Sequence, residues 1–168
     1  YGVVGNTWTL NIPPIDSIPE GVYDVSASVI DAAGNVSFDS GIKEIIIDRT
    51  APVITAQTHS YNENRAANQV IGTVSASDNI GLGSFGFKWA DNSIKPMTED
   101  GMFTIDENGK VRSTATGASA GSGANDFESG PNSRSDSVVV SDQLGATAEA
   151  LVTLKVRDVN ESSVPGPA

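Results

Sequence analysis

Apolar and polar residues alternate along most of the chain with a period of two. The alternation is clearest over residues 22–30 and 150–157, and it recurs over residues 7–12 and 85–89. A period of two places one face of an extended strand on a core and leaves the other face toward solvent. No stretch has the 3.6-residue period of an amphipathic helix. We therefore expect an all-β protein.

The predicted strands are short and are separated by turns that are rich in glycine. In the first part of the chain they lie near residues 6–12, 22–30 and 42–47. Farther along they lie near residues 53–58, 68–77, 83–90, 102–105, 110–114, 135–141 and 147–157. Short strands at this spacing are typical of antiparallel Greek-key β-sandwiches, which is the fold class that we expect.

Two units are predicted, with a boundary near residues 48–52. Pro52 disfavours a helical residue before it and lacks a backbone donor, so this segment is expected to be an extended linker. Residues 1–50 supply only about three strands, whereas a complete sandwich needs about seven. We therefore expect a partial first unit, which is either truncated or completed by a distant segment of the same protein or by another chain.

Residues 51–161 are long enough for a complete β-sandwich. Within them, residues 113–125 are almost entirely serine, threonine, glycine and alanine, a composition that predicts a mobile loop. Residues 162–168 contain Pro165 and Pro167 and are predicted to be a linker or a tail.

The chain is strongly acidic. It contains 21 Asp and Glu residues against 10 Lys and Arg residues, for a net charge of −11. An acidic protein lacks the basic face that nucleic acids and anionic membranes require. No apolar run approaches the roughly 20 residues of a membrane span, so we expect no membrane insertion. Cysteine is absent, which excludes disulfides and thiol catalysis. We expect a monomer.

The sequence gives little indication of catalysis. It has one histidine and no Gly-x-Ser-x-Gly motif. Paired carboxylates could in principle hydrolyse glycosides, yet no aromatic-lined cleft is indicated and the acidic residues fall at strand ends. We therefore expect no enzymatic activity.

Most carboxylates lie where a predicted strand ends. Ca²⁺ takes 6–8 hard oxygen ligands, which carboxylates, amides and loop carbonyls supply. Carboxylates that crowd at one end of a sandwich repel one another unless a cation lies among them. The sequence therefore predicts bound calcium, with candidate ligands Glu20, Asp31, Asp48, Glu63, Asp78, Asp126, Glu128, Asp142, Asp158 and Asn160.

Strand ends alternate between the two poles of an antiparallel sandwich, which assigns each ligand to a pole. The far pole of the second unit is expected to hold Glu63, Asp126, Glu128, Asp158 and Asn160. The near pole is expected to hold Asp78 and Asp142, which would face Glu20 and Asp48 of the first unit. For Asp31 and Asp142 the pattern leaves open whether the carboxylate binds metal or only its own turn, whereas Asp106 is expected to be a turn residue.

Short motifs occur in a specific order along the chain. Those of the second unit lie at residues 62–64 (Asn-Glu-Asn), 76–78 (Ala-Ser-Asp), 103–111, 125–128 (Asn-Asp-Phe-Glu) and 158–161 (Asp-Val-Asn-Glu). Those of the first unit lie at residues 7–10, 20–23 and 31–35. Together they resemble half of a bacterial immunoglobulin-like repeat followed by a cadherin-like repeat of bacterial RTX-type surface adhesins. Ile80 and Phe127 depart from this pattern, because they replace an aspartate and an arginine.

The resemblance implies a module of a long adhesin whose repeats are stiffened by calcium. Such a module would be extracellular, at the bacterial cell surface, and exported by a signal outside this segment. Its partners would be neighbouring repeats of the same adhesin. Its role would be that of a spacer in cell adhesion and biofilm formation.

An alternative is a ligand-binding module of the same adhesin that grips a peptide or glycan of a host or microbial surface. The long insert at residues 90–101 and the long loop at residues 113–134 favour this alternative. Calcium would then lie in or near the ligand site, with Asp91, Asn92 or Lys95 nearby.

Overall fold

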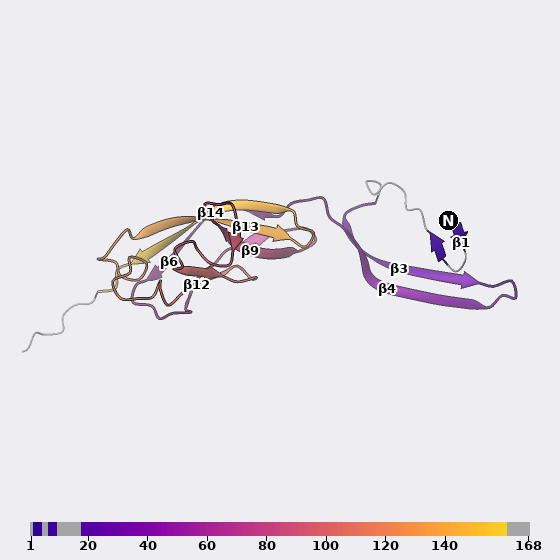
Figure 1. Ribbon diagram of the computed structural model, residues 1–168, viewed down its shortest axis with the longest axis horizontal. Coiled ribbons are helices and arrows are strands. Elements are labelled where there is room, and N and C mark those ends of the chain that lie inside the picture. The colour runs from indigo at the N-terminus through magenta and orange to yellow at the C-terminus, as the bar shows by residue number, and fades with distance from the viewer. Residues whose placement is uncertain (1, 5–6, 10–17, 161–168) are drawn as a thin grey trace, which may run out of the picture. The chain divides into compact units, whose positions relative to one another are not determined.

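The computed structural model describes residues 2–4, 7–9 and 18–160, and every regular element among them is a strand (Figure 1). The chain divides into two compact units, Tyr1–Arg49 and Thr50–Ala168. None of the described residues forms a helix that is long and apolar enough to cross a bilayer. The predicted tail at residues 162–168 lies outside the described residues, as do residues 10–12 of the first predicted strand.

Within the first unit, residues 2–4, 7–9 and 18–49 form two antiparallel strand pairs. Strand β1 (Gly2–Val4) pairs with β2 (Thr7–Thr9), and β3 (Gly21–Ile30) pairs with β4 (Val36–Ile47) in a long hairpin. The prediction for the last strand was wrong at its start, because β4 begins at Val36 and not near residue 42. Residues 36–41 pair one by one with the second half of β3. This backbone pairing extends β4 toward its start, although several of the added residues are polar.

The β3–β4 hairpin leaves large apolar side chains in solvent. Val29, Ile30 and Val36 are all at least 60% exposed, and Phe38 and Ile42 are 67% and 79% exposed. A two-stranded hairpin is marginally stable in water without a second layer. The first unit therefore lacks, among the described residues, the covering layer that a sandwich would place on this hairpin.

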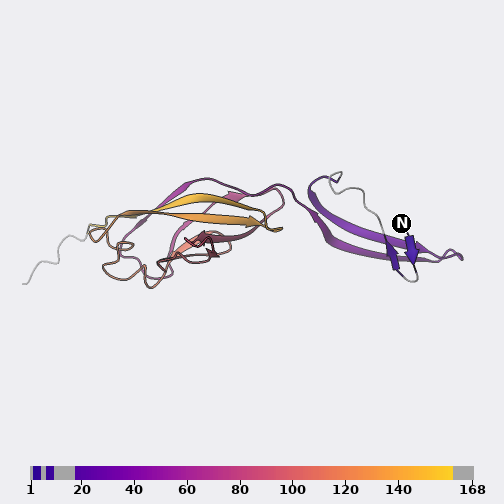
Figure 2. The same ribbon diagram turned by 45° about the horizontal axis from the view of Figure 1, so that its top comes forward.

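The described residues of the second unit form ten strands in three sheets. Their bounds are β5 (Val53–Ile54), β6 (Gln57–Asn62), β7 (Val70–Thr73), β8 (Ala76–Ser77), β9 (Leu82–Lys88), β10 (Ile94–Lys95), β11 (Phe103–Ile105), β12 (Lys110–Ser113), β13 (Ser133–Asp142) and β14 (Thr147–Arg157). The sheet orders are β10-β9-β13-β14-β6, β11-β12-β7 and β5-β8. Figure 2 shows the long β13–β14 pair, in orange and yellow, on one side of this unit and shorter strands on the other.

Two predicted strands are each divided in the structure. The strand predicted at residues 53–58 is β5, which pairs with β8, followed by β6, which pairs with β14 in parallel. The chain changes sheets between them, where the Gln57 amide exchanges two hydrogen bonds with the Ser75 backbone. The strand predicted at residues 68–77 is likewise divided into β7 and β8. The parallel β6–β14 pair departs from the purely antiparallel expectation, since a residue pattern does not encode a strand's partner.

One hydrophobic core lies between the sheets of the second unit. Its buried members include Tyr61, Ile71, Phe87, Phe103, Ile105, Val111, Val138, Val152 and Leu154, which come from both of the larger sheets. Trp89, at the end of the alternation over residues 85–89, is only half-buried and donates a hydrogen bond from Nε1 to the Met97 carbonyl, 2.7 Å away. The second unit is thus a β-sandwich, as predicted.

Candidate metal centre

Three carboxylates meet at one end of the second unit. Glu63 follows β6, whereas Asp126 and Glu128 belong to the loop before β13. One oxygen atom from each carboxylate lies within 4.8 Å of one oxygen of each of the others. Residues about 60 positions apart in the sequence are therefore brought to one point, with only hard oxygen donors. We call Glu63, Asp126 and Glu128 the far-pole cluster.

Glu63 organises this cluster. Its side chain is only 4% exposed, and its two oxygens accept hydrogen bonds from different segments. Oε2 accepts from the Phe127 N–H and Oε1 from the Val159 N–H, each at 2.7 Å. These bonds hold the loop before β13 and the segment after β14 against the end of β6. Carboxylate oxygens keep further lone pairs after accepting one hydrogen bond each, so they can still face a cation.

The two acidic residues of the loop are held by their own turn. Asp126 Oδ1 accepts from the Glu128 N–H at 3.1 Å, and Asp126 Oδ2 accepts from the Ser129 hydroxyl at 2.6 Å. Asp126 is half-buried and Glu128 is exposed. The turn thereby directs two carboxylates spaced two residues apart toward Glu63.

Asp158 and Asn160 follow β14 and are exposed. Asp158 is close enough to act on Glu128 through its charge. Partial desolvation raises the pKa of Glu128 above its ordinary value, and so do the charges of its acidic neighbours Glu63, Asp158 and Asp126. The metal-free arrangement is therefore electrostatically unfavourable for Glu128 and would be relieved by a cation.

The effect of Glu128→Gln on stability is expected to reverse with calcium. Without the ion, the substitution removes a repelled charge, so the urea midpoint at pH 7 is expected to stay equal or to rise. With calcium at millimolar concentration, the variant lacks one ligand and is expected to unfold at lower urea than the parent. Equilibrium unfolding in chelator and in calcium measures both midpoints.

The difference in stability between Glu128→Gln and the parent is expected to depend on pH in one direction. Since the folded protein raises the pKa of Glu128, the favourable contribution of its protonated form is present at low pH and is lost as pH rises through the folded value. In chelator, any advantage of the variant must therefore disappear as pH falls through the raised pKa of Glu128, because the parent side chain is then neutral as well. An equal destabilisation in chelator and in calcium would contradict this electrostatic account.

The near pole of the second unit holds Asp78 and Asp142. Asp78 follows β8, and its Oδ1 accepts from the N–H groups of Ile80 and Gly81, both at 2.8 Å. Asp142 ends β13 and is 4% exposed, and its Oδ1 accepts from two N–H groups of the following turn. One oxygen of each carboxylate lies within 4.8 Å of the other. The structure therefore brings these two predicted ligands together.

Glu20 and Asp48 belong to the first unit. Glu20 Oε1 accepts a hydrogen bond from the Arg49 N–H at 2.7 Å, and Asp48 directly follows β4. Their predicted approach to Asp78 and Asp142 stays a prediction.

Asp31 and Asp106 both organise hairpin turns. Asp31 Oδ1 accepts from the N–H groups of Ala33 and Asn35, and Oδ2 accepts from the Asn35 amide. These bonds, with that of the Asn35 side chain foremost, lower the pKa of Asp31. Asp106 Oδ1 accepts from two N–H groups of the β11–β12 turn in the same way. The contacts favour a turn role for both residues.

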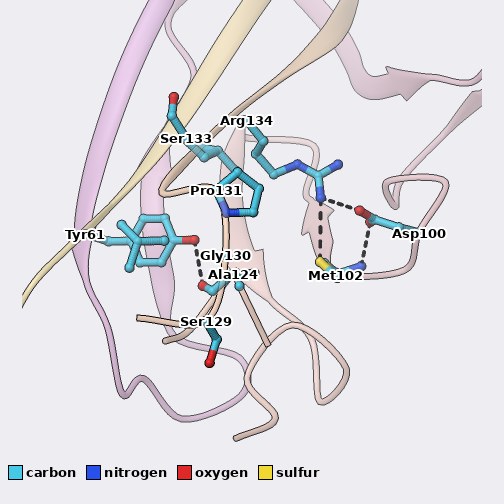
Figure 3. Close-up of a pocket in the computed structure, with 12 residues that line it drawn as sticks. Tyr61, Asp100, Met102, Ala124, Ser129, Gly130, Pro131, Ser133 and Arg134 are labelled. Atoms are coloured by element: carbon cyan, nitrogen blue, oxygen red, sulfur yellow. Dashed lines mark hydrogen bonds and ion pairs between the residues drawn. The ribbon is translucent and has the colours of Figure 1, made fainter. Parts of the chain in front are cut away.

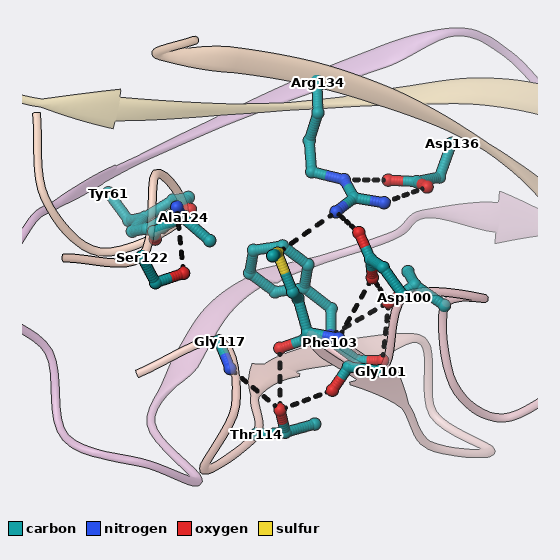
Figure 4. Close-up of polar contacts among 12 residues, drawn as sticks. Tyr61, Asp100, Gly101, Phe103, Thr114, Gly117, Ser122, Ala124, Arg134 and Asp136 are labelled. Atoms are coloured by element: carbon teal, nitrogen blue, oxygen red, sulfur yellow. Dashed lines mark hydrogen bonds and ion pairs between the residues drawn. The ribbon is translucent and has the colours of Figure 1, made fainter. Parts of the chain in front are cut away.

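The loop at residues 113–125 is packed, contrary to the expectation of a mobile segment. Successive turns are closed by backbone hydrogen bonds such as Ala118 N–H to Thr114 O and Asn125 N–H to Ser122 O. Figure 4 shows Thr114 accepting from the Gly117 N–H and donating to the Gly101 carbonyl. Side chains too small to pack thus allow close backbone turns. Asn125 entered the sequence interpretation only as the first residue of the motif at residues 125–128, and its buried contacts were not foreseen.

A cavity of about 290 Å³ adjoins the same loop, lined in part by Tyr61, Met102, Pro131 and Arg134 (Figure 3). Tyr61 donates a hydrogen bond to the Ala124 carbonyl at 2.7 Å, and burial raises the pKa of Tyr61 to about 12. The lining of the cavity is mostly apolar. The phenol of Tyr61 at one wall is therefore neutral at ordinary pH.

Arg134 is fully engaged by acidic partners at the edge of this cavity. It makes a bidentate ion pair with Asp136 at 2.6 and 2.7 Å, a second ion pair with Asp100, and lies 5.3 Å from the centre of the Phe103 ring (Figure 4). Although burial opposes its charge, the bonds to Asp136 and Asp100 raise the pKa of Arg134. A guanidinium with two carboxylate partners is not available as an anion receptor.

No model of a known protein family matches this sequence, and no curated protein matches it. Among solved structures, protocadherin gammaB7 EC3-6, a cis-dimer structure, is 19% identical with a TM-score of 0.54. The match covers 88% of this chain and 35% of that chain. The human desmocollin-1 ectodomain is 17% identical with a TM-score of 0.51, and the match covers 78% of this chain and 25% of that chain.

The chain has a cadherin-like β-sandwich fold. At these identities the likeness shows the fold alone. The chain also spans only about a third or less of the length of these two structures.

Proposed function

We propose that the second unit is a calcium-binding module of a large bacterial surface adhesin, in which it acts as a spacer in cell adhesion and biofilm formation. The observation that carries the proposal is the convergence of Glu63, Asp126 and Glu128 within 4.8 Å of one another. The cadherin-like fold and the strand-end position of these acids support it.

The donor set fits calcium better than other divalent ions. The far-pole cluster offers only carboxylate oxygens, the sequence contains no cysteine, and no histidine belongs to the cluster to favour a softer metal. Two of the carboxylates lie in a turn, and Asp158 and Asn160 follow in an exposed segment. Ca²⁺ accepts many oxygens in irregular geometry, whereas Mg²⁺ demands near-ideal octahedral geometry. Glu63, Asp126, Glu128, Asp158 and Asn160 would hold the ion.

The position of Glu63 explains how an ion would stiffen the module. The chain leaves the sandwich after β14, and the Val159 N–H is bonded to Glu63. An ion shared by Glu63, the loop at residues 126–128 and Asp158 would fix this exit to the body of the domain. The following segment would then leave in one direction, as a spacer requires.

The proposed cellular location follows from the calcium affinity expected of such sites. Extracellular calcium modules commonly bind at about 10⁻⁴–10⁻³ M, which is matched to calcium outside cells. We therefore propose an extracellular location at the bacterial cell surface, neighbouring repeats of the same adhesin as partners, and no enzymatic role. The assignment of residues 1–50 to a partial immunoglobulin-like unit is part of the same proposal.

Calorimetric titration with calcium tests the proposal, with Asp126→Ala and Asp106→Ala as matched variants. The parent and Asp106→Ala are expected to bind alike, because Asp106 serves only its hairpin turn. Asp126→Ala is expected to bind about 10-fold more weakly or worse, and to lose more thermal stability in calcium. Absence of binding by the parent would refute the proposed function, and the reverse order of the variants would refute the assignment of the far-pole cluster.

A ligand-binding role is the second candidate, and the cavity beside Arg134 favours it. Asp91 Oδ1 caps a tight turn by accepting from the Ser93 N–H, and from the insert at residues 90–101 only Asp100 lines the cavity. Peptide and glycan arrays probed in calcium and in chelator would separate the candidates. Binding to an array would support the ligand-binding role, whereas absence of binding on both arrays would favour the spacer role.

A further inference from the structure

Asn125 joins two loops that are distant in the sequence. Its side chain is buried, with the residue only 6% exposed. Oδ1 accepts from the Arg65 N–H at 2.7 Å, and Nδ2 donates to the Arg65 carbonyl at 3.2 Å. The amide thus pairs with both backbone groups of one residue, as a neighbouring strand would. Nδ2 also donates to the Ala118 carbonyl at 3.0 Å, which fastens the loop at residues 113–125 to the same point.

The backbone continues this pairing toward the far-pole cluster. The Asn64 N–H donates to the Asn125 carbonyl at 3.0 Å, and the Phe127 N–H donates to Glu63 Oε2 at 2.7 Å. Residues 125–127 therefore run alongside residues 63–65. Since Asp126 lies between these two attachment points, its backbone has little freedom to move away from Glu63.

We propose that Asn125 is a positioning residue of the metal centre, which holds Asp126 and Glu128 opposite Glu63 without touching the ion. The inference rests on the proposed calcium site. It assigns the preorganisation of that site to an uncharged side chain, which fixes where the carboxylates stand before the ion arrives. Preorganised ligands bind more tightly because less conformational freedom is lost on binding.

The substitution Asn125→Asp separates positioning from charge. Aspartate keeps the size of the side chain but loses the Nδ2 donor, so a carboxylate oxygen would face the carbonyls of Arg65 and Ala118. It also adds a negative charge beside the cluster, which by itself would attract calcium more strongly. The two effects have opposite signs, and only displacement of the loop weakens binding.

Calcium titration of the whole chain by calorimetry decides between them. Asn125→Asp and Asn125→Ser are both expected to bind about 10-fold more weakly or worse, as is common when a residue that orients metal ligands is replaced. Asn108→Asp, which adds the same charge in the exposed β11–β12 turn, is expected to stay close to the parent. Equal or tighter binding by Asn125→Asp overturns the inference, whereas absence of binding by the parent overturns the proposed calcium site itself.

Unfolding in urea with and without calcium distinguishes positioning from a general loss of stability. If Asn125 only supports the fold, each variant loses the same stability in chelator and in calcium, and the inference fails. If Asn125 positions the ligands, calcium raises the free energy of unfolding of the variants by less than it raises that of the parent. Should Asn125→Asp fail to fold, Asn125→Ser decides alone, because serine adds no charge and retains an oxygen that can accept a hydrogen bond.

Discussion

Removal of calcium is expected to lower the melting temperature of this protein by about 10 °C. An ion that binds only the folded state stabilises it by RT ln(1 + [Ca]/Kd), which is about 2.7 kcal/mol at a hundredfold excess over Kd. With a Kd of about 10⁻⁴ M, a concentration of about 10 mM calcium gives that excess. For a domain of this size each kcal/mol shifts the midpoint by roughly 4 °C.

Differential scanning calorimetry in calcium, in chelator, and in chelator followed by excess calcium measures this shift. Restored calcium is expected to restore the midpoint, which shows that the chelator acted by removing the ion. Magnesium at the same concentration is expected to recover little of it. A melting curve that is the same in chelator and in calcium would count against any calcium role of the far-pole cluster.

Glu63→Gln is expected to be the most damaging single substitution at the far pole. The two oxygens of Glu63 accept from the Phe127 and Val159 N–H groups, and a glutamine can offer an oxygen to only one of them. Both hydrogen bonds are partly buried, and leaving one N–H without its acceptor costs about 1 kcal/mol or more, a loss that is expected even in chelator. The variant also lacks the buried charge that would face the proposed ion, so its calcium affinity is expected to fall about 10-fold or more.

Urea unfolding in chelator measures the first effect and calorimetric titration measures the second. Glu107→Gln is the matched control, since it removes the same charge from the exposed turn between β11 and β12. A Glu63→Gln variant with parental stability in chelator would show that the two hydrogen bonds contribute little. Parental calcium affinity would show that the ion does not depend on Glu63.

These two experiments bear on different properties of the same residues. Glu63 joins three segments in the absence of metal, so part of its contribution belongs to the fold. Asp126 and Glu128 are more exposed and are held by their own turn, so their contribution should appear mainly with the ion. The far-pole cluster thus combines one buried carboxylate that joins three segments with two less buried carboxylates that the loop before β13 holds opposite it.

The local alternation of residues was sufficient to place most strands. The strands predicted near residues 83–90, 135–141 and 147–157 correspond to β9, β13 and β14 within a few residues. A period of two reflects the geometry of a single extended chain with one buried face, and it can be read without knowledge of any partner. Residue chemistry likewise indicated which side chains could bind calcium, because carboxylates at strand ends are hard oxygen donors wherever they meet.

Contacts between distant segments were decided by the tertiary structure. The sequence pattern did not indicate that β6 pairs in parallel with β14, or that the chain changes sheets at Gln57. It also gave no sign that Asn125 would pair with Arg65 and order a loop of small residues. Such pairings depend on which backbone groups remain without partners once the sheets have formed, and a local pattern carries no information about them. The sequence therefore determined what each strand and each acidic side chain could do, and packing determined which of them stand together.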